Sequence, residues 1–206
     1  MMNRFFCIAL LAVFSVSAVS AQNNNKVKRF LLAIGGHHQG AEYGSIVDLK
    51  AQKTYKVAEA AEHQGDIDLL YAYGTTTKAN LLTPNSSTVR LFGPNYKTKI
   101  SEAWDVKNRG MMVALKADKR NKKIFKKLKK NADIEKLYVE TVKSVRDLPD
   151  YKLLRNGPAR RLVDLQIGDL VIFRSQDRKF YAAGLVVNLK TGTKGMIDID
   201  FKITQE

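Results

Sequence analysis

The C-terminal third of the chain alternates apolar and polar side chains in a pattern typical of β-strands. Between residues 196 and 203 every second side chain is apolar, and those between them are mostly charged. Such a strand has one buried and one solvated face, as in an antiparallel sheet. Two apolar runs at 170–174 and 180–189 precede it and are joined by short turns. The pattern therefore predicts a C-terminal β-meander.

The first half of the chain mixes shorter patterns. Apolar runs predict strands at residues 30–34, 45–49, 66–73 and 111–115. A short helix is predicted at 55–64, because Gly65 stands where a helix would end. Residues 74–100 are rich in Thr, Asn, Ser, Pro and Gly, which predicts a long loop region with one short strand at 89–92.

Helical periodicity is clearest between residues 133 and 145, where apolar side chains recur every three or four positions behind Asp133, a helix-capping residue. Residues 116–130 carry a narrower apolar stripe at helical spacing. Together with the strands, these helices predict an α+β fold. We expect a single domain with an antiparallel or mixed sheet, two or three helices and the C-terminal β-meander.

The first 21 residues have the three regions of a secretory signal peptide. Arg4 is followed by an apolar run at 5–19 and by small residues that end at Ala21. The run is shorter than the roughly 20 residues that a transmembrane helix needs. We therefore expect cleavage after Ala21, a mobile tail at 22–29 and one globular domain at 30–206. The processed protein would be periplasmic or secreted, with no transmembrane span.

The only cysteine, Cys7, lies near the start of this apolar run. A lipoprotein signal places its cysteine directly after the run, so lipid attachment at Cys7 is not expected. Cleavage would leave a chain without cysteine, which excludes zinc–thiolate sites and cysteine nucleophiles. A chain of this length buries a sufficient core without disulfides.

Positive charge is concentrated in one segment. The chain has 35 basic and 20 acidic residues, a net charge of +15, and nine of the basic residues lie within 116–130 beside a single acid, Asp118. A helix with this surface attracts phosphate or sulfate groups with salt-dependent affinity; the alternative is an ordinary solvated helix face. The candidate anion-binding residues are Lys119, Arg120, Lys122, Lys123, Lys126, Lys127, Lys129 and Lys130, with Arg155, Arg160 and Arg161 as candidate extensions.

Two other groups of polar residues have weaker patterns. His37 and His38 are adjacent on a glycine-flanked loop, but zinc needs three or four ligands, so no metal site is expected. The pairs Asp66/Asp68 and Asp198/Asp200 each place two carboxylates on one strand face, which suits a cation or acid–base chemistry. Their alternation with Ile and Leu favours a solvated strand face, and pairing with Lys or Arg is a further alternative.

Tyr71, Tyr73 and Trp104 could form an aromatic platform for a sugar, but their apolar neighbours on the strand favour core packing. The sequence contains no P-loop, dinucleotide-binding glycine motif or GxSxG motif. No catalytic residue and no cofactor is assigned on these patterns.

Residues 35–84 resemble a group of exported proteins, many of them lipoproteins, from Bacteroidetes-type bacteria. The shared pieces are short: Gly44-Ser45, Asp48-Leu49, Lys53-Thr54-Tyr55, Glu59-Ala60, Ile67-Asp68-Leu69, Tyr71-Ala72-Tyr73-Gly74 and Thr83-Pro84. The region of Trp104 with Asn108-Arg109 and the C-terminal meander are also similar. The resemblance implies export, and because the group has no assigned activity it implies no chemistry. This chain lacks the cysteine that anchors the lipoproteins.

These features predict an exported, non-enzymatic binding or surface-associated module that prefers an anionic partner. Candidate partners are an anionic glycan, lipopolysaccharide or an acidic protein, with nucleic acid less favoured. The alternative is an envelope hydrolase or transferase whose site combines scattered carboxylates with His37 and His38.

Overall fold

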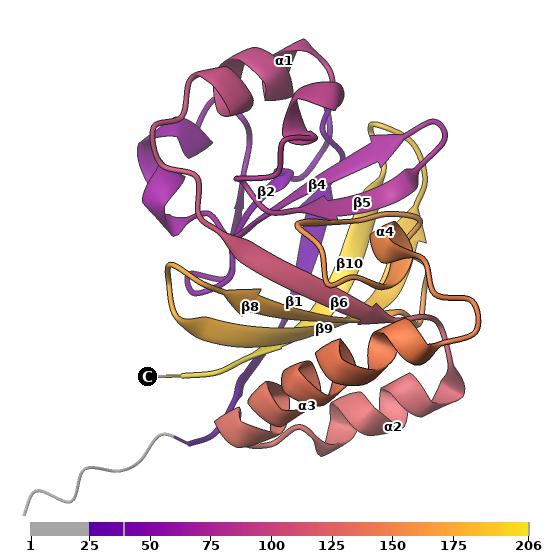
Figure 1. Cartoon of the computed structure of the whole chain (residues 1–206). Helices are drawn as coiled ribbons and strands as arrows, with labels where there is room; N and C mark the ends of the chain where they lie inside the picture. The colour runs from indigo at the N-terminus through magenta and orange to yellow at the C-terminus, as the bar shows by residue number, and fades with distance from the viewer. Residues whose placement is uncertain (1–24, 39, 206) are drawn as a thin grey trace, which may run out of the picture.

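Two five-stranded sheets face each other and carry helical segments on their outer surfaces (Figure 1). This arrangement comes from a computed structural model that describes residues 25–38 and 40–205. The predicted signal peptide, its cleavage site and Cys7 lie outside the described residues. The α+β class and the single-domain organisation are confirmed, with more helical segments than the two or three expected.

The first sheet has the strand order β1-β10-β9-β8-β6, with every neighbouring pair antiparallel. Its strands are β1 (Lys28–Gly35), β6 (Gly110–Leu115), β8 (Leu170–Ser175), β9 (Phe180–Lys190) and β10 (Met196–Ile203). Because β8, β9 and β10 are joined by short turns and pair in sequence, the predicted meander is confirmed. β1 pairs with β10 along its whole length and takes in Lys28 and Arg29, which the sequence placed in the tail.

The second sheet has the order β3-β2-β4-β5-β7 and is also antiparallel throughout. Its strands are β2 (Ile46–Asp48), β3 (Lys53–Tyr55), β4 (Leu69–Gly74), β5 (Lys78–Leu82) and β7 (Arg161–Leu162). The strand predicted at 45–49 is confirmed as the shorter β2, and the one predicted at 66–73 is confirmed as β4, which begins at Leu69 and ends at Gly74.

The main core lies between the two sheets and receives alternate side chains from both. All four apolar side chains of the alternating pattern in β10 are buried in this core: Ile197, Ile199, Phe201 and Ile203. Alternation along the strand therefore predicts correctly which face of β10 meets the opposite sheet.

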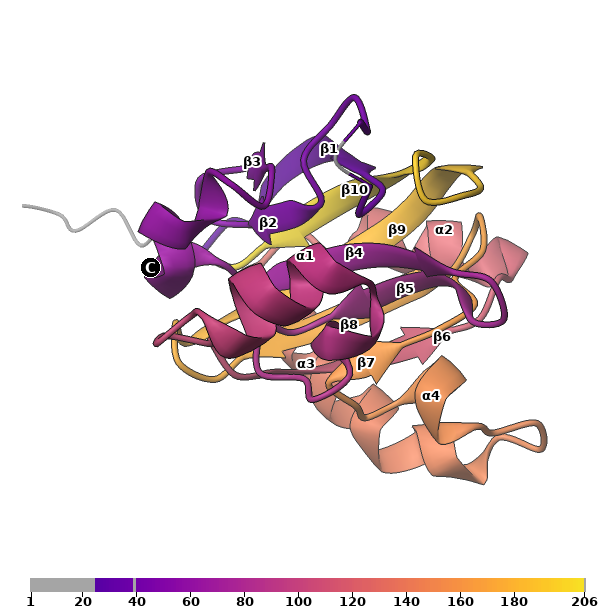
Figure 2. The same ribbon diagram turned by 90° about the horizontal axis from the view of Figure 1, so that it is seen from above.

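Helices cover the outer face of each sheet (Figures 1 and 2). α2 (Lys119–Lys127) and α3 (Asn131–Ser144) pack on the first sheet. The second sheet is covered by η1 (Ala60–Asp66), η2 (Val89–Leu91), α1 (Pro94–Tyr96) and η3 (Lys97–Glu102). Two short segments, η4 (Val145–Asp147) and α4 (Leu153–Asn156), lie between α3 and β7. Within the described residues, no helix has the length and apolar character to cross a membrane.

The segment 74–100 differs from its prediction. It contains β5 and three helical turns rather than a long loop, and the strand expected at 89–92 is the 3₁₀ turn η2. Val89 and Phe92 are buried while Leu91 is 66% exposed, so the buried positions are three residues apart rather than two. The period of three matches a 3₁₀ turn. The helix expected at 55–64 is likewise wrong in extent, because Tyr55 ends β3 and the 3₁₀ helix η1 begins at Ala60.

Candidate functional site

The helix predicted within residues 116–130 is confirmed as α2, which turns one narrow side to the first sheet. Phe125 and Asn121 are buried on this side. The Asn121 Nδ2 donates to the carbonyl oxygens of Leu115, Lys116 and Gly168, at 3.1, 2.9 and 2.9 Å. These bonds fix the first turns of α2 against β6 and against the turn that precedes β8.

A buried lysine fixes the other end of α2. Lys202 of β10 is only 4% exposed, and its Nζ donates to the carbonyl oxygens of Phe125 and Leu128, both at 2.7 Å. The Nζ also lies 4.8 Å from the centre of the Phe125 ring. A cation at this position meets the negative end of the helix dipole. Burial lowers the pKa of Lys202, and these contacts hold its ammonium group in place.

Replacing Lys202 with methionine is expected to lower the free energy of unfolding by about 2–3 kcal/mol, because two buried carbonyl groups lose a charged donor. The matched control is Lys129→Met, which removes an exposed lysine from the same end of α2 and is expected to change stability by less than about 0.5 kcal/mol. Urea unfolding followed by circular dichroism measures both. Equal losses in the two variants would contradict the structural role of Lys202.

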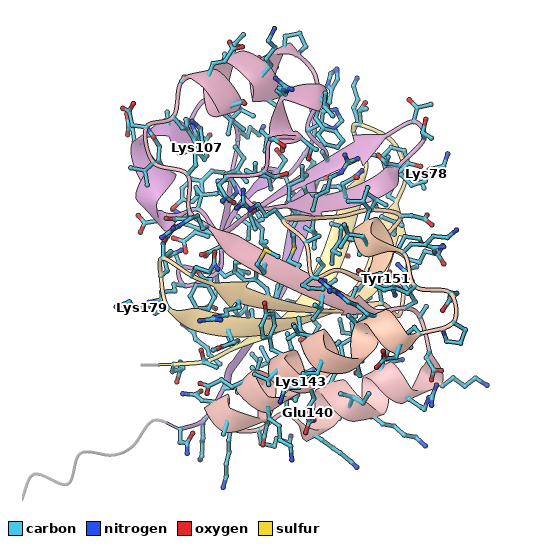
Figure 3. All side chains as sticks on the ribbon, viewed as in Figure 1. Lys78, Lys107, Glu140, Lys143, Tyr151 and Lys179 are labelled. Carbon is cyan, nitrogen blue, oxygen red and sulfur yellow. The ribbon has the colours of Figure 1, made fainter. Side chains whose placement is uncertain are left out.

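All eight predicted anion-binding side chains are exposed, and they form what we call the basic face: Lys119, Arg120, Lys122, Lys123, Lys126, Lys127, Lys129 and Lys130. Arg120 pairs with Asp118 at 3.0 Å. Within the described residues, none of the seven lysines forms an ion pair. Side chains of α2 extend away from the sheet into solvent (Figure 3).

The neighbouring helix α3 shows that this charge is not a general property of the surface. It carries charges of both signs, and Lys136 pairs with Glu140 at 3.8 Å. Glu140 and Lys143 lie close together on this helix in Figure 3. The excess of positive charge therefore belongs to α2 and the residues that follow it.

The structure adds one lysine to the basic face that sequence patterns do not reveal. Lys26 forms a β-bridge with Lys130, and the Val27 N–H donates to the carbonyl of Lys129 at 3.2 Å. Lys26 is exposed beside the end of the basic face. Because this contact joins residues about a hundred positions apart, no local pattern could have predicted it.

Two of the three candidate extensions have contacts of their own. The Arg155 Nη2 pairs with Asp164 at 3.0 Å. The Arg161 Nε and Nη2 donate to the Asn80 Oδ1 at 3.0 and 2.9 Å. Asp164 neutralises Arg155, and the Asn80 contact holds the Arg161 side chain against β5, so neither side chain extends the basic face.

The two adjacent histidines lie in different surroundings. The His37 Nδ1 accepts the Tyr73 N–H at 3.2 Å, and its ring packs edge-on against Phe92 and Tyr96. Burial lowers the pKa of His37, which keeps the imidazole neutral. The exposed His38 accepts the N–H of Gly40. No group of three or more metal-ligating side chains is found in the described part of the chain.

A cavity of about 200 Å³ lies beside these histidines. Its charged lining residues are Lys56 and Lys99, and both predicted carboxylate pairs lie elsewhere. The cavity therefore does not bring the predicted carboxylate pairs together with His37 and His38.

Each predicted carboxylate pair contains an acid that is paired with arginine. Asp66 is not on a strand but ends η1, and its side chain is 59% exposed. Asp68 is fully buried and its Oδ2 accepts the Arg178 Nη1 at 2.6 Å. Arg178 also pairs with Asp48 at 3.0 Å. On β10, Asp200 pairs with Arg29 at 2.6 Å. The expectation of solvation is wrong for Asp68, whereas the alternative of pairing with arginine is correct.

The aromatic residues take the expected core positions. Tyr71 is completely buried between the sheets, and Trp104 is 2% exposed under the helical layer of the second sheet. Tyr73 is partly buried against the main core. These positions leave no exposed stack of the three rings for a sugar.

Comparison with known proteins identifies a similar fold. No protein-family model matches the chain, and no curated protein matches it. Among solved structures it is similar to a DUF4466 family protein from Parabacteroides merdae, with a TM-score of 0.54 and 11% sequence identity. The match covers 87% of this chain and 54% of that one, so this chain spans about half the length of the matching protein. At this identity the likeness shows the fold, in a protein from the bacterial group that the sequence resemblance indicates.

Proposed function

We propose that this chain is an exported, non-enzymatic module that binds an anionic partner through the basic face. The observation that carries the proposal is the set of seven exposed lysines that form no ion pair in the described structure. The signal-peptide pattern and the resemblance to exported proteins support the location. In a periplasmic or extracellular setting, phosphate and sulfate groups on glycans and lipopolysaccharide are suitable partners.

Repulsion among these lysines destabilises α2, and a bound anion would offset it. Like charges three or four residues apart repel each other and destabilise a helix by a few tenths of a kcal/mol per pair. Lys119, Lys122, Lys123, Lys126 and Lys127 have this spacing on α2. A bound polyanion removes the repulsion and releases its own counterions, so affinity falls as salt concentration rises.

The experiment that tests this proposal is elution from heparin with increasing salt. The test variant changes Lys122, Lys123, Lys126 and Lys127 to Glu. We expect the wild-type protein to be retained and the test variant to appear in the wash, because binding to polyanions depends on the number of neutralising cations.

The matched control changes Lys99, Lys152, Lys190 and Lys194 to Glu, which alters the net charge equally. These four lysines are exposed and lie outside α2, in η3, directly before α4 and in the β9–β10 hairpin. The control is expected to keep most of its retention, and circular dichroism shows whether each variant is folded. Equal losses in both variants would indicate a net-charge effect, and unchanged retention of the test variant would overturn the proposal.

A further inference from the structure

An apolar groove of about 400 Å³ opens beside the first turns of α2. Its apolar lining comes from Ile167, Leu185, Val186 and Val187. Two lysines of the basic face, Lys119 and Lys122, also line it. Ile167 is 56% exposed and Val187 is 39% exposed, so the groove presents apolar surface to solvent directly beside positive charge.

The wall that carries Ile167 is held in place by a buried carboxylate. Asp169 accepts hydrogen bonds from the Ala117 N–H at 2.7 Å and the Gln166 N–H at 3.0 Å, and it pairs with Lys116. The Asn121 side chain ties the Gly168 carbonyl to α2 from the other side. Ile167 is therefore presented by a turn that hydrogen bonds fix against α2. Exposing an isoleucine at such a site costs free energy that an apolar ligand would recover.

The charge at the groove is positive. Asp118 is its one acidic lining residue, and its carboxylate accepts the Arg120 N–H at 2.6 Å and pairs with the Arg120 side chain. Arg120 holds the pKa of Asp118 below its usual range, so this acid stays ionised and neutralised by its partner. Lys119 and Lys122 have no such partner among the described residues.

We infer that this groove binds an acyl chain of an anionic lipid while Lys119 and Lys122 contact the lipid phosphate. This inference rests on the proposed function and narrows its anion to an amphiphile. The adjacent apolar and cationic surfaces match the two chemically different parts of such a lipid. A second copy of the chain fits less well, because it would bring a basic face of the same sign against this one. A soluble glycan has no apolar chain to fill the groove.

Isothermal titration calorimetry on the chain from Gln22 onward, which contains every strand and helix of the described fold, tests the inference. The probes are monomeric dioctanoyl phosphatidylglycerol and its headgroup alone, glycerophosphoglycerol. We expect the lipid to bind at least about tenfold more tightly than the headgroup, because its chains bury apolar surface. The double variant Ile167→Ser/Val187→Ser is expected to bind the lipid no more tightly than the headgroup, with heparin elution unchanged.

The matched control is Leu91→Ser, which removes a 66% exposed leucine over the second sheet and is expected to leave lipid affinity unchanged. If the double variant binds the lipid as tightly as wild type does, the inference that the groove holds an acyl chain is overturned. The inference is also overturned if wild type sediments as a dimer and the double variant as a monomer while lipid affinity is the same in both. That result would assign the groove to self-association. The proposed function is tested separately by heparin elution. It fails if retention on heparin does not depend on the lysines of α2, whatever the calorimetry shows.

Discussion

Replacing Arg178 with methionine is expected to lower the free energy of unfolding at pH 8 by about 3–5 kcal/mol, because two buried carboxylates lose their cation. Arg178 lies in the turn between β8 and β9 of the first sheet, and its side chain is 13% exposed. Its partners are on the second sheet: Asp48 lies in β2, and Asp68 directly precedes β4. The Arg178 Nη1 lies 3.0 Å from the Asp48 carboxylate and 2.6 Å from that of Asp68. The guanidinium therefore links the two sheets at one end of the core.

The control for this variant is an arginine that precedes β6 and pairs with an acid of the same turn. Arg109 pairs with Asp177 at 2.6 Å, but its side chain is 63% exposed. Replacing Arg109 with methionine is expected to cost no more than about 1 kcal/mol, because solvent screens an exposed pair. Urea unfolding of both variants gives the comparison. A loss for Arg178→Met as small as that for Arg109→Met would show that Asp48 and Asp68 do not depend on the arginine.

The parts of the fold that could be predicted depend on local periodicity. Alternation predicts the three strands of the meander and the apolar side chains of β10 that fill the core. A period of three to four predicts both long helices. The basic residues of α2 were identifiable for the same reason, since a helix with one narrow apolar stripe leaves its remaining positions in solvent.

The parts that could not be predicted depend on what covers the second face of a strand. Lys202 and Asp68 both occupy polar positions in alternating patterns, which indicate solvent when considered alone. Lys202 is instead buried under α2, and Asp68 is buried against a turn 110 residues further along the chain. Alternation distinguishes the two faces of a strand, but the elements packed on them come from distant sequence. The groove was missed likewise, because it joins α2 to β9 and to the turn at Ile167.

Asp68 also makes the stability of the fold fall as the pH rises, which is the opposite of what an ion-paired carboxylate usually does. Burial raises the pKa of the Asp68 carboxyl to about 7, outweighing the opposite effect of Arg178. The Asp68 Oδ1 has no hydrogen-bond partner among the described residues and can carry the proton. Between the unfolded-state pKa near 4 and pH 7, the folded protein therefore binds a proton that the unfolded chain has released.

From this difference, the free energy of unfolding is expected to fall by a few kcal/mol as pH rises from about 4 to above 7, since each pKa unit corresponds to about 1.4 kcal/mol. The Asp68→Asn variant should lose this contribution, because its amide keeps an oxygen for the Leu49 N–H and does not titrate. His37 contributes with the opposite sign, because its pKa is lowered in the fold. Urea unfolding across this pH range, plotted as the difference between wild type and Asp68→Asn, removes the His37 contribution. A constant difference would show that Asp68 is ionised in the folded protein throughout. The outcome expected from its burial is that the unfolding free energy of wild type minus that of Asp68→Asn falls as the pH rises.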